Sequence, residues 1–233
     1  MDIQVLGSGS KGNAYLAMLP ERGGVTLLLD CGLTWGTMQK KFGYLLSVAD
    51  ACLITHEHGD HAKGVQAVMQ NGINVYTSRG TAEALGIADH HRCHIVEPNA
   101  VFNVGPSVQV KTLPVEHDAA QPFAYLIRDT AYDEMLLFAT DLQYLPYNIP
   151  GLTHAMVEAN YEYDNMSLDD SDLNRRVMKS HMSIDALEEW LLTGDAKNTL
   201  EEIWLLHLSD DRSNEAEFKR RIQQATGALV HVA

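Results

Sequence analysis

Three of the eleven histidines in the chain lie within six residues of one another. They belong to segment 55–61, which reads THEHGDH and follows an apolar run. In an extended chain, His56 and His58 project to the same side and can share a metal ion. Asp60 and His61 lie beyond a glycine bend and turn toward a second position. Imidazole and carboxylate together suit Zn²⁺, Mn²⁺ or Fe²⁺ and argue against Ca²⁺ or Mg²⁺, whose ligands are oxygen atoms.

One segment supplies too few ligands for a metal centre, and further candidates follow other apolar runs. A single His or Asp after a strand is more often a cap or a surface residue. The same arrangement occurs here at several strand ends, and a cluster of His and Asp would be costly to bury without a metal. We therefore expect these residues to bind metal: His56, His58, Asp60, His61, His117, Asp141 and His207.

The elements that position these residues are predicted from hydrophobic patterns. Short apolar segments bounded by turn residues predict strands. They are Ile3–Leu6, Val25–Leu29, Ala51–Thr55, Ile73–Tyr76, Val108–Leu113, Phe123–Ile127, Met135–Ala139, Ala155–Val157 and Ile203–Leu206. Helices are predicted over Ala62–Gln70 and Thr81–Leu85, and the stretch from Cys93 to Val110 alternates like a meander.

The final third of the chain has a different pattern, with helices on either side of a strand. Ser183 can cap one helix and Asn214 can cap a second. Many strands followed by strands mixed with helices predict two sheets packed face to face with helices outside. The acidic stretch Tyr161–Asp172 predicts an exposed loop, with a metal-binding or specificity role as the alternative.

Composition limits the partners of the protein. The chain has 233 residues, 45% apolar and 21% charged, as expected for one globular domain over residues 1–233. Its 17 basic and 31 acidic residues give a net charge of −14, which excludes binding to nucleic acid or anionic membranes through bulk charge alone. Any phosphate-bearing partner must therefore be bound locally.

The sequence also gives an expectation for location. No apolar run approaches the roughly 18–20 residues of a membrane span, and a signal peptide is not evident, so we expect a cytoplasmic protein without membrane contact. Cys31, Cys52 and Cys93 are far apart and odd in number, which favours buried thiols over disulfides. Nothing in the sequence indicates an obligate protein partner.

The ligand pattern resembles the metallo-β-lactamase superfamily, whose signature is H-x-H-x-D-H followed by a His, an Asp and a last His. Segment 27–32, LLLDCG, resembles the first motif of that family. The resemblance implies an α/β fold, a four-layer αββα sandwich, with a centre of two divalent metal ions. It assigns the ligands as follows: His56, His58 and His117 to one ion; Asp60, His61 and His207 to the other; Asp141 to both.

Shorter motifs resemble the WalJ/YycJ branch of that superfamily, whose members are single-domain nucleases, including DNA exonucleases. The motifs are residues 7–13 (GSGSKGN), 116–122 (EHDAAQP), 158–160 (EAN), 180–183 (SHMS) and 207–209 (HLS). The chain is too short for the inserted domain of β-CASP nucleases and shows no evident tRNA-binding arm. Histidine at position 58 disfavours the flavodiiron oxygen reductases, where Glu usually occupies that position.

Two cations that share a water molecule lower its pKa and stabilise the charge that develops on phosphorus, so phosphodiester hydrolysis suits such a centre. His181 resembles the non-ligand catalytic His of tRNase Z and is the candidate acid for the leaving group, together with Asp60 as a catalytic residue. Packing at a helix start, or metal ligation, is the alternative for His181. Asp30 is expected to hold the ligand segment in place rather than to bind metal.

Substrate contacts are expected from the glycine-rich loop and from residues near the metal ligands. Ser10, Lys11, Asn13 and Asn160 are the candidates, although a glycine-rich loop can also be a plain turn. A short basic run before His181, formed by Arg175, Arg176 and Lys179, could attract phosphate or could be a solvated helix face.

The resulting hypothesis is a metal-dependent hydrolase, a phosphodiesterase or nuclease, with nucleic acid and in particular DNA as its substrate. Zn²⁺ and Mn²⁺ both suit the ligands. The alternatives are a hydrolase of a small ester, thioester or lactam with the same centre, and a non-catalytic metal-binding or nucleic-acid-binding module.

Overall fold

The computed structural model describes residues 1–19, 24–163 and 172–233. These residues form two compact units. Unit 1 comprises Met1–Pro114 and Ala119–Glu134, and unit 2 comprises Val115–Asp118 and Met135–Ala233. Each unit is described by itself, and the expectation of one domain over residues 1–233 stays a prediction.

One sheet of unit 1 has the strand order β1-β2-β3-β4-β5-β6, antiparallel from β1 to β3 and parallel from β3 to β6. Its strands are β1 (Asp2–Gly7), β2 (Ala14–Leu19), β3 (Val25–Leu29), β4 (Ala51–Leu53), β5 (Asn74–Thr77) and β6 (Cys93–Ile95). Every residue of β3 and β4 is buried, which explains why these strands read as continuous apolar runs.

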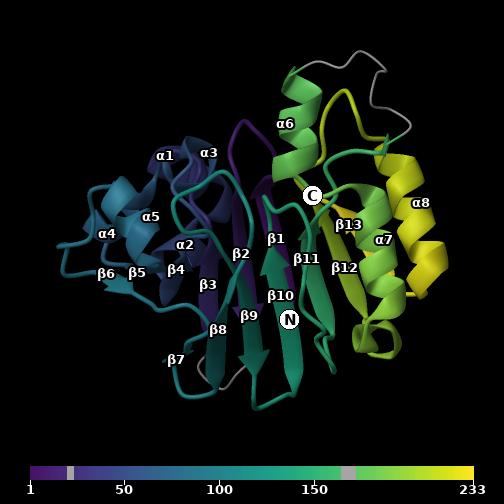
Figure 1. Cartoon of the computed structure of the whole chain (residues 1–233). Helices are drawn as coiled ribbons and strands as arrows, with labels where there is room; N and C mark the ends of the chain where they lie inside the picture. The colour runs from purple at the N-terminus through teal and green to yellow at the C-terminus, as the bar shows by residue number, and fades with distance from the viewer. Residues whose placement is uncertain (20–23, 164–171) are drawn as a thin grey trace. The chain divides into compact units, whose positions relative to one another are not determined.

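Helices cover one face of this sheet (Figure 1). They are α1 (Trp35–Phe42), α2 (Tyr44–Ser47), α3 (Gly59–Ala62), α4 (Val65–Gln70) and α5 (Arg79–Ala84). Met38 of α1 and Val68 of α4 are fully buried in a core with Cys52 and Val75 of the sheet. The apolar face of each helix is therefore what holds it on the strands.

Antiparallel strands pack on the sheet of unit 1 as well: β7 (Val101–Val104), β8 (Val108–Pro114) and β9 (Phe123–Asp129). The side chains of β8 alternate between buried and exposed, as expected for a strand with one covered face. The buried Tyr125 hydroxyl of β9 donates to the carbonyl of Ile54 at 2.7 Å, and the ring of Phe102 stacks on Tyr76 at 4.7 Å.

Unit 2 contains parallel strands in the order β13-β12-β11-β10. Its elements are β10 (Glu134–Ala139), β11 (His154–Glu158), α6 (Asp172–Ser180), α7 (Ile184–Thr193), a short 3-10 helix (Asp195–Asn198), β12 (Glu202–Leu206), α8 (Glu215–Thr226) and β13 (Leu229–Val232). Helices α7 and α8 pack against each other beside β12 and β13 (Figure 1). Because the strands are parallel, the residues that follow them, such as Asp141, Asn160 and His207, come to the same edge of the sheet.

The predicted helix caps and most of the predicted strands agree with the structure, but several elements were not predicted. The side chains of Ser183 and Asn214 accept hydrogen bonds from the first turns of α7 and α8, which confirms both caps. The meander between Cys93 and Val110 corresponds to β6, β7 and the start of β8. The sequence pattern missed β2, β13, α1, α2 and α6. Strand β13 and helix α2 have only four residues each and carry too little periodicity, whereas β2 is a six-residue, mostly buried apolar run that was not identified.

Two further predictions need correction. The helix expected over Ala62–Gln70 is two short helices, α3 and α4, and α3 begins at Gly59, so Asp60 and His61 are helical. The stretch Tyr161–Asp172 is not wholly an exposed loop, because Tyr161 is buried and pairs with Ser183, and Asp172 begins α6. The rest of that prediction, residues 164–171, lies outside the described residues.

All three cysteines are free thiols; Cys31 and Cys52 are buried and Cys93 is half-buried. Every helix in the described part of the chain is too short or too polar to span a bilayer.

Tyr125→Phe should lower the free energy of unfolding by about 1 kcal/mol, because it removes a buried hydroxyl that bonds the carbonyl of Ile54. The loss should not exceed this value, since the Thr77 hydroxyl also donates to that carbonyl and leaves it one partner. Urea denaturation measures it, with Tyr132→Phe, at an exposed position, as the control. Equal midpoints for the two variants would contradict this account of the packing.

Candidate metal centre

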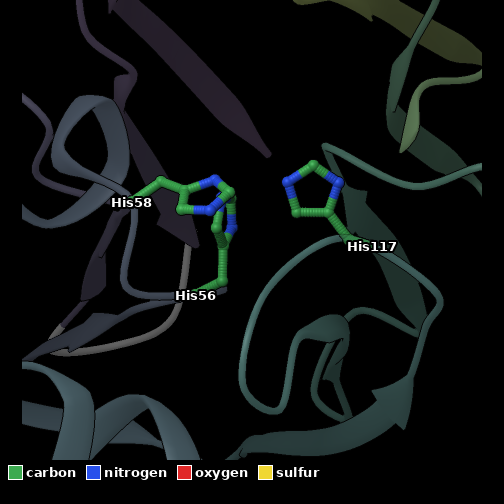
Figure 2. A group of neighbouring side chains, drawn as sticks. All are labelled: His56, His58 and His117. Carbon is green, nitrogen blue, oxygen red and sulfur yellow. The ribbon is translucent and has the colours of Figure 1, made fainter. Parts of the chain in front are cut away.

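In unit 1, the loop that follows β4 carries the histidine cluster. Figure 2 shows His56 and His58 on this loop, with ring centroids 4.6 Å apart in an edge-to-face arrangement. The His56 ring also lies 4.2 Å from that of His61. His56 and His61 are fully buried, so the cluster is part of the interior of the unit and not a surface patch.

Asp60 and His61 form a second donor pair on the same segment. The Asp60 Oδ2 atom lies 3.6 Å from His61 Nε2. Two donor atoms that bind one tetrahedral ion at about 2.0–2.1 Å are roughly 3.4 Å apart, so this spacing suits a shared ion. Unit 1 thus presents two pairs of donors, His56 with His58 and Asp60 with His61.

The buried carboxylate of Asp30 contacts two residues of this segment. Asp30 Oδ2 lies 2.7 Å from His61 Nδ1, and the backbone N–H of Thr55 donates to Asp30 Oδ1 at 2.8 Å. Burial raises the pKa of Asp30 above its ordinary value, and the hydrogen bonds from His61 and Thr55 oppose that rise. A carboxylate on one ring nitrogen fixes the tautomer of a metal-ligating His, so Asp30 has the geometry of a residue that orients a ligand.

The glycine-rich loop also contacts the ligand segment. Asn13 is fully buried, its backbone N–H donates to the Asp60 carbonyl at 2.7 Å, and its side-chain nitrogen lies 2.9 Å from His61 Nε2. Its side-chain oxygen accepts from Gly9 N at 2.7 Å. Ser10 and Lys11 are exposed at the tip of this loop. Asn13 therefore contacts the ligand segment directly, and substrate contacts by Ser10, Lys11 and Asn13 stay predictions.

Gly32 explains why the first motif must contain a glycine. A Cβ atom at this position would overlap the carbonyl group of Asp60 and crowd the backbone nitrogen of Asn13. The backbones of the LLLDCG motif and of the ligand segment can approach each other only when residue 32 has no side chain.

In unit 2, Asp141 lies between two histidines. Its Oδ2 is 3.8 Å from His117 Nε2, and its Oδ1 is 3.4 Å from His207 Nδ1. The Asp141 Oδ2 contact is to the Nε2 atom of His117, whereas the Nδ1 atom of His207 also lies 3.0 Å from Glu158 Oε1. Figure 2 also shows His117, on the loop that follows β8. The Nδ1 atom of His117 lies 2.9 Å from the carbonyl of Ser180, which orients the ring.

Glu158 is the functional residue that the sequence reasoning did not assign. Its buried carboxylate lies 2.6 Å from His181 Nδ1 and 3.0 Å from His207 Nδ1, and it accepts the N–H groups of Leu142 and Met182 at 3.1 Å. Asp141, Glu158, His181 and His207 each offer a donor atom within 4.8 Å of the others. The signal was present, because Glu158 ends an apolar strand just as Asp141 follows one.

Glu158 and His181 each shift the pKa of the other. Burial alone would raise the pKa of Glu158, but the His181 charge and the hydrogen bonds of His181 and His207 hold it below its ordinary value. Burial alone would lower the pKa of His181, but the Glu158 carboxylate raises it above its ordinary value. His181 is therefore kept in its protonated form at a higher pH than an isolated histidine.

Burial and hydrogen bonds determine the state of His117 and the position of Asn160. Burial lowers the pKa of His117, although the Asp141 charge and the hydrogen bond to the Ser180 carbonyl raise it. The lowered pKa favours the neutral ring, which is the form that binds metal. Asn160 is buried, and its side-chain nitrogen donates to the His207 carbonyl at 2.7 Å. Asn160 thus supports His207, and its contact with substrate stays a prediction.

The comparison with protein families identifies the class. Residues 26–201 match the beta-lactamase superfamily domain, so the chain belongs to that superfamily. The predicted family and fold class, two sheets with helices in an α/β arrangement, are confirmed, and with them the expectation of a hydrolase. The donors fit divalent transition-metal ions, because a carboxylate oxygen and an imidazole nitrogen lie 3.6 Å apart in Asp60 and His61 and 3.8 Å apart in Asp141 and His117, near the spacing of two ligands on one ion.

Individual relatives are similar over much of the chain. Exodeoxyribonuclease WalJ of Streptococcus pneumoniae is 29% identical over 232 residues, which cover 90% of this chain and 82% of the relative. Anti-Pycsar protein Apyc1 of Saccharibacillus brassicae is 36% identical over 172 residues, 61% of this chain and 70% of the relative. The solved structure of human tRNase Z, short form, has a TM-score of 0.68 at 17% identity and covers 100% of this chain and 96% of that one, which shows a shared fold.

Gly32→Ala should lower the bound metal per chain and the unfolding midpoint together, because the added methyl group displaces the Asp60 backbone. Elemental analysis of purified protein and thermal unfolding measure the two effects. Gly36→Ala is the matched control, since its Cβ would meet no atom and it lies in α1, where Ala is favoured. Equal metal content in the two variants would contradict the proposed contact.

Asp30→Asn should weaken metal affinity by about 10- to 100-fold with little change in fold. Asn tolerates the left-handed backbone of residue 30 (φ 54°), so the substitution removes the charge behind His61 without backbone strain. Competition of the metal-loaded protein with a chromogenic chelator gives the affinity. An unchanged affinity would show that the carboxylate does not act through His61.

Proposed function

We propose that this protein is a dinuclear metal-dependent phosphodiesterase that hydrolyses nucleic acid, with DNA as its substrate. The observation that carries the proposal is the spacing of the donor atoms: Asp60 Oδ2 lies 3.6 Å from His61 Nε2 in unit 1, and Asp141 Oδ2 lies 3.8 Å from His117 Nε2 in unit 2. His56 and His58, with ring centroids 4.6 Å apart, add a second donor pair in unit 1.

The proposed ligand assignment is the one that the resemblance to the superfamily implies. One ion would be held by His56, His58 and His117, the other by Asp60, His61 and His207, and Asp141 would join both. When bound, two divalent ions lower the pKa of a shared water molecule and stabilise charge on a phosphoryl group. Zn²⁺ or Mn²⁺ is the proposed metal, since both accept imidazole with carboxylate.

His181 is proposed to donate the proton that the leaving oxygen needs. Its raised pKa keeps the ring protonated to a higher pH than an isolated histidine, and Glu158 at 2.6 Å from Nδ1 fixes the ring so that Nε2 carries the transferable proton. The side chain is 18% exposed, so it is accessible to a substrate although its partner is buried. After the transfer, the Glu158 carboxylate favours reprotonation of the ring.

The substrate class rests on the relatives. WalJ of Streptococcus pneumoniae and YycJ of Bacillus anthracis, 29% and 26% identical to this chain, are both named exodeoxyribonucleases. DNA hydrolysis in the cytoplasm, with no obligate protein partner, is therefore the proposal. Hydrolysis of a small ester, thioester or lactam by the same centre is the competing outcome that the experiment must separate.

The test uses Zn²⁺- or Mn²⁺-loaded protein with labelled single- and double-stranded DNA and RNA. Asp60→Ala should abolish cleavage, and His181→Ala should lower kcat about 10²- to 10⁴-fold while metal content stays unchanged, as expected for a lost general acid. His91→Ala, at an exposed histidine, is the control.

Cleavage that survives Asp60→Ala, or no cleavage of any polymer, would reject the nuclease proposal. Turnover of small esters or lactams that does not depend on His181 would favour the competing hydrolase. Loss of metal in His181→Ala would instead assign that residue as a ligand.

A further inference from the structure

Glu57 lies between His56 and His58 but is not one of the proposed metal ligands. In an extended chain its side chain projects away from the side that the two histidines share. Both of its carboxylate oxygens accept hydrogen bonds: Oε1 from the backbone N–H of Ala120 at 2.7 Å, and Oε2 from the Thr81 hydroxyl at 3.4 Å. Glu57 therefore joins the ligand segment to a distant part of the chain within unit 1.

The stretch that contains Ala120 is hydrogen-bonded at further points, and we call residues 120–123 the return segment. The N–H of Phe123 donates to the Thr55 carbonyl at 3.0 Å. The side-chain oxygen of Gln121 accepts the N–H of Gly80 at 2.9 Å. These bonds connect the return segment to the loop that follows β4 and to the first turn of α5.

The hydrogen bond between Ala120 and Glu57 is the one of these that lies nearest to His117 along the chain. Ala120 follows His117 by three residues, whereas Phe123 follows it by six. Ala120 is exposed, so its position depends on this hydrogen bond more than on packing. A hydrogen bond to a carboxylate is roughly twice as strong as one between neutral groups. Glu57 is therefore a strong restraint on the end of the loop that carries His117.

Gly80 shows how closely the return segment approaches α5. A Cβ atom at this position would lie 2.8 Å from the Cβ atom of Gln121 and 3.3 Å from the carbonyl carbon of Ala120. Alanine is favoured over glycine inside a helix, so helix propensity does not explain a glycine here. The close approach of the return segment does explain it. A substitution at Gly80 therefore displaces the same segment without any change to Glu57.

Glu57 is not placed to bind an ion itself. Both of its oxygens have hydrogen-bond donors. Among the described residues, the groups of histidines and acids that are spaced to hold one ion do not include Glu57. An effect of Glu57 on the metal centre must therefore pass through the segment that it holds.

In the proposed ligand assignment, one ion is held by His56, His58 and His117, and we call it the first ion. We infer that Glu57 is a positioning residue that orients His117 for the first ion, because it fixes the chain three residues beyond that ligand. Loss of a residue that orients a metal ligand typically weakens metal affinity 10- to 100-fold. This role rests on the proposed dinuclear function, and it leaves the affinity for the second ion unchanged.

The test is a titration of the metal-depleted full chain with Co²⁺ against a chromogenic chelator, which gives the number of bound ions and the affinity of each. Glu57→Ala removes the acceptor, whereas Glu57→Gln keeps an oxygen for the N–H of Ala120. Gly80→Ala displaces the return segment from the side of α5. The matched controls are Glu83→Ala, at an exposed glutamate of α5, and Gly36→Ala, where a Cβ atom would meet no other atom.

Glu57→Ala and Gly80→Ala should weaken binding of the first ion by about 10- to 100-fold and leave the second ion unaffected. Glu57→Gln and both controls should bind two ions as the wild type does. His117→Ala identifies which affinity belongs to the first ion. In that background Glu57→Ala should cause no further loss, because residues that act through one contact are not additive. Hydrogen exchange of the Ala120 amide should become faster in Glu57→Ala and not in Glu57→Gln.

Equal weakening of both ions in Glu57→Ala, or a further loss when it is added to His117→Ala, would overturn the inference, since either result assigns Glu57 a general structural role. Binding of the first ion to Glu57→Ala or Gly80→Ala as to the controls would also overturn it. If Glu57→Ala does not fold, Gly80→Ala alone decides in the same way.

Failure of the proposed function gives different results. A wild-type protein that binds fewer than two ions overturns the ligand assignment, and the role of Glu57 with it. A protein that binds two ions, loses the first one in Glu57→Ala and cleaves no nucleic acid overturns the nuclease proposal alone.

Discussion

The candidate site depends on carboxylates that are buried against imidazoles. Asp30 and Glu158 are both fully buried, and each contacts a histidine at 2.6–2.7 Å. A buried carboxylate without a partner would be strongly destabilising, so each acid requires its histidine as much as the histidine requires the acid. This mutual requirement fixes the rings of His61 and His181 before any metal or substrate is present.

An unusual backbone conformation occurs at three strand ends of the candidate site. Asp30, Asp141 and His207 all have left-handed φ angles, between 52° and 54°. Such conformations are unfavourable for residues with a side chain, of the order of 1–3 kcal/mol each, and persist only where the surroundings determine them. Each of the three follows a strand of its sheet. Asn99 and Asp133, outside the candidate site, also have left-handed φ angles, of 60° and 56°, so the conformation is not confined to that site.

The supporting residues show how much of the site lies outside the ligands themselves. Gly32 allows two backbones to approach, Asn13 bonds the ligand segment, and the Ser180 carbonyl orients His117. Glu158 joins His181 and His207 to the N–H groups of Leu142 and Met182. Many of these contacts are made by backbone groups, so the positions of the proposed ligands depend on the path of the backbone as well as on their side-chain partners.

The sequence by itself determined the family, the fold class and the proposed ligand residues. Segment 55–61 and the residues that close apolar strands could be found because a strand end and a ligand type are both local features. The buried strands β3 and β4 were readable for the same reason, since burial on both faces leaves a continuous apolar run.

Only the tertiary structure decided which groups contact which. Glu158 ends an apolar strand, but its partners His181 and His207 follow it by 23 and 49 residues, and only the structure brings them into contact with it. The short strand β13 was also missed, since its stability comes from packing and not from periodicity. A contact between distant residues has no signature in either segment alone, so the support of the ligand segment by Asp30 was expected from a motif, whereas the contacts of Glu158 were not expected.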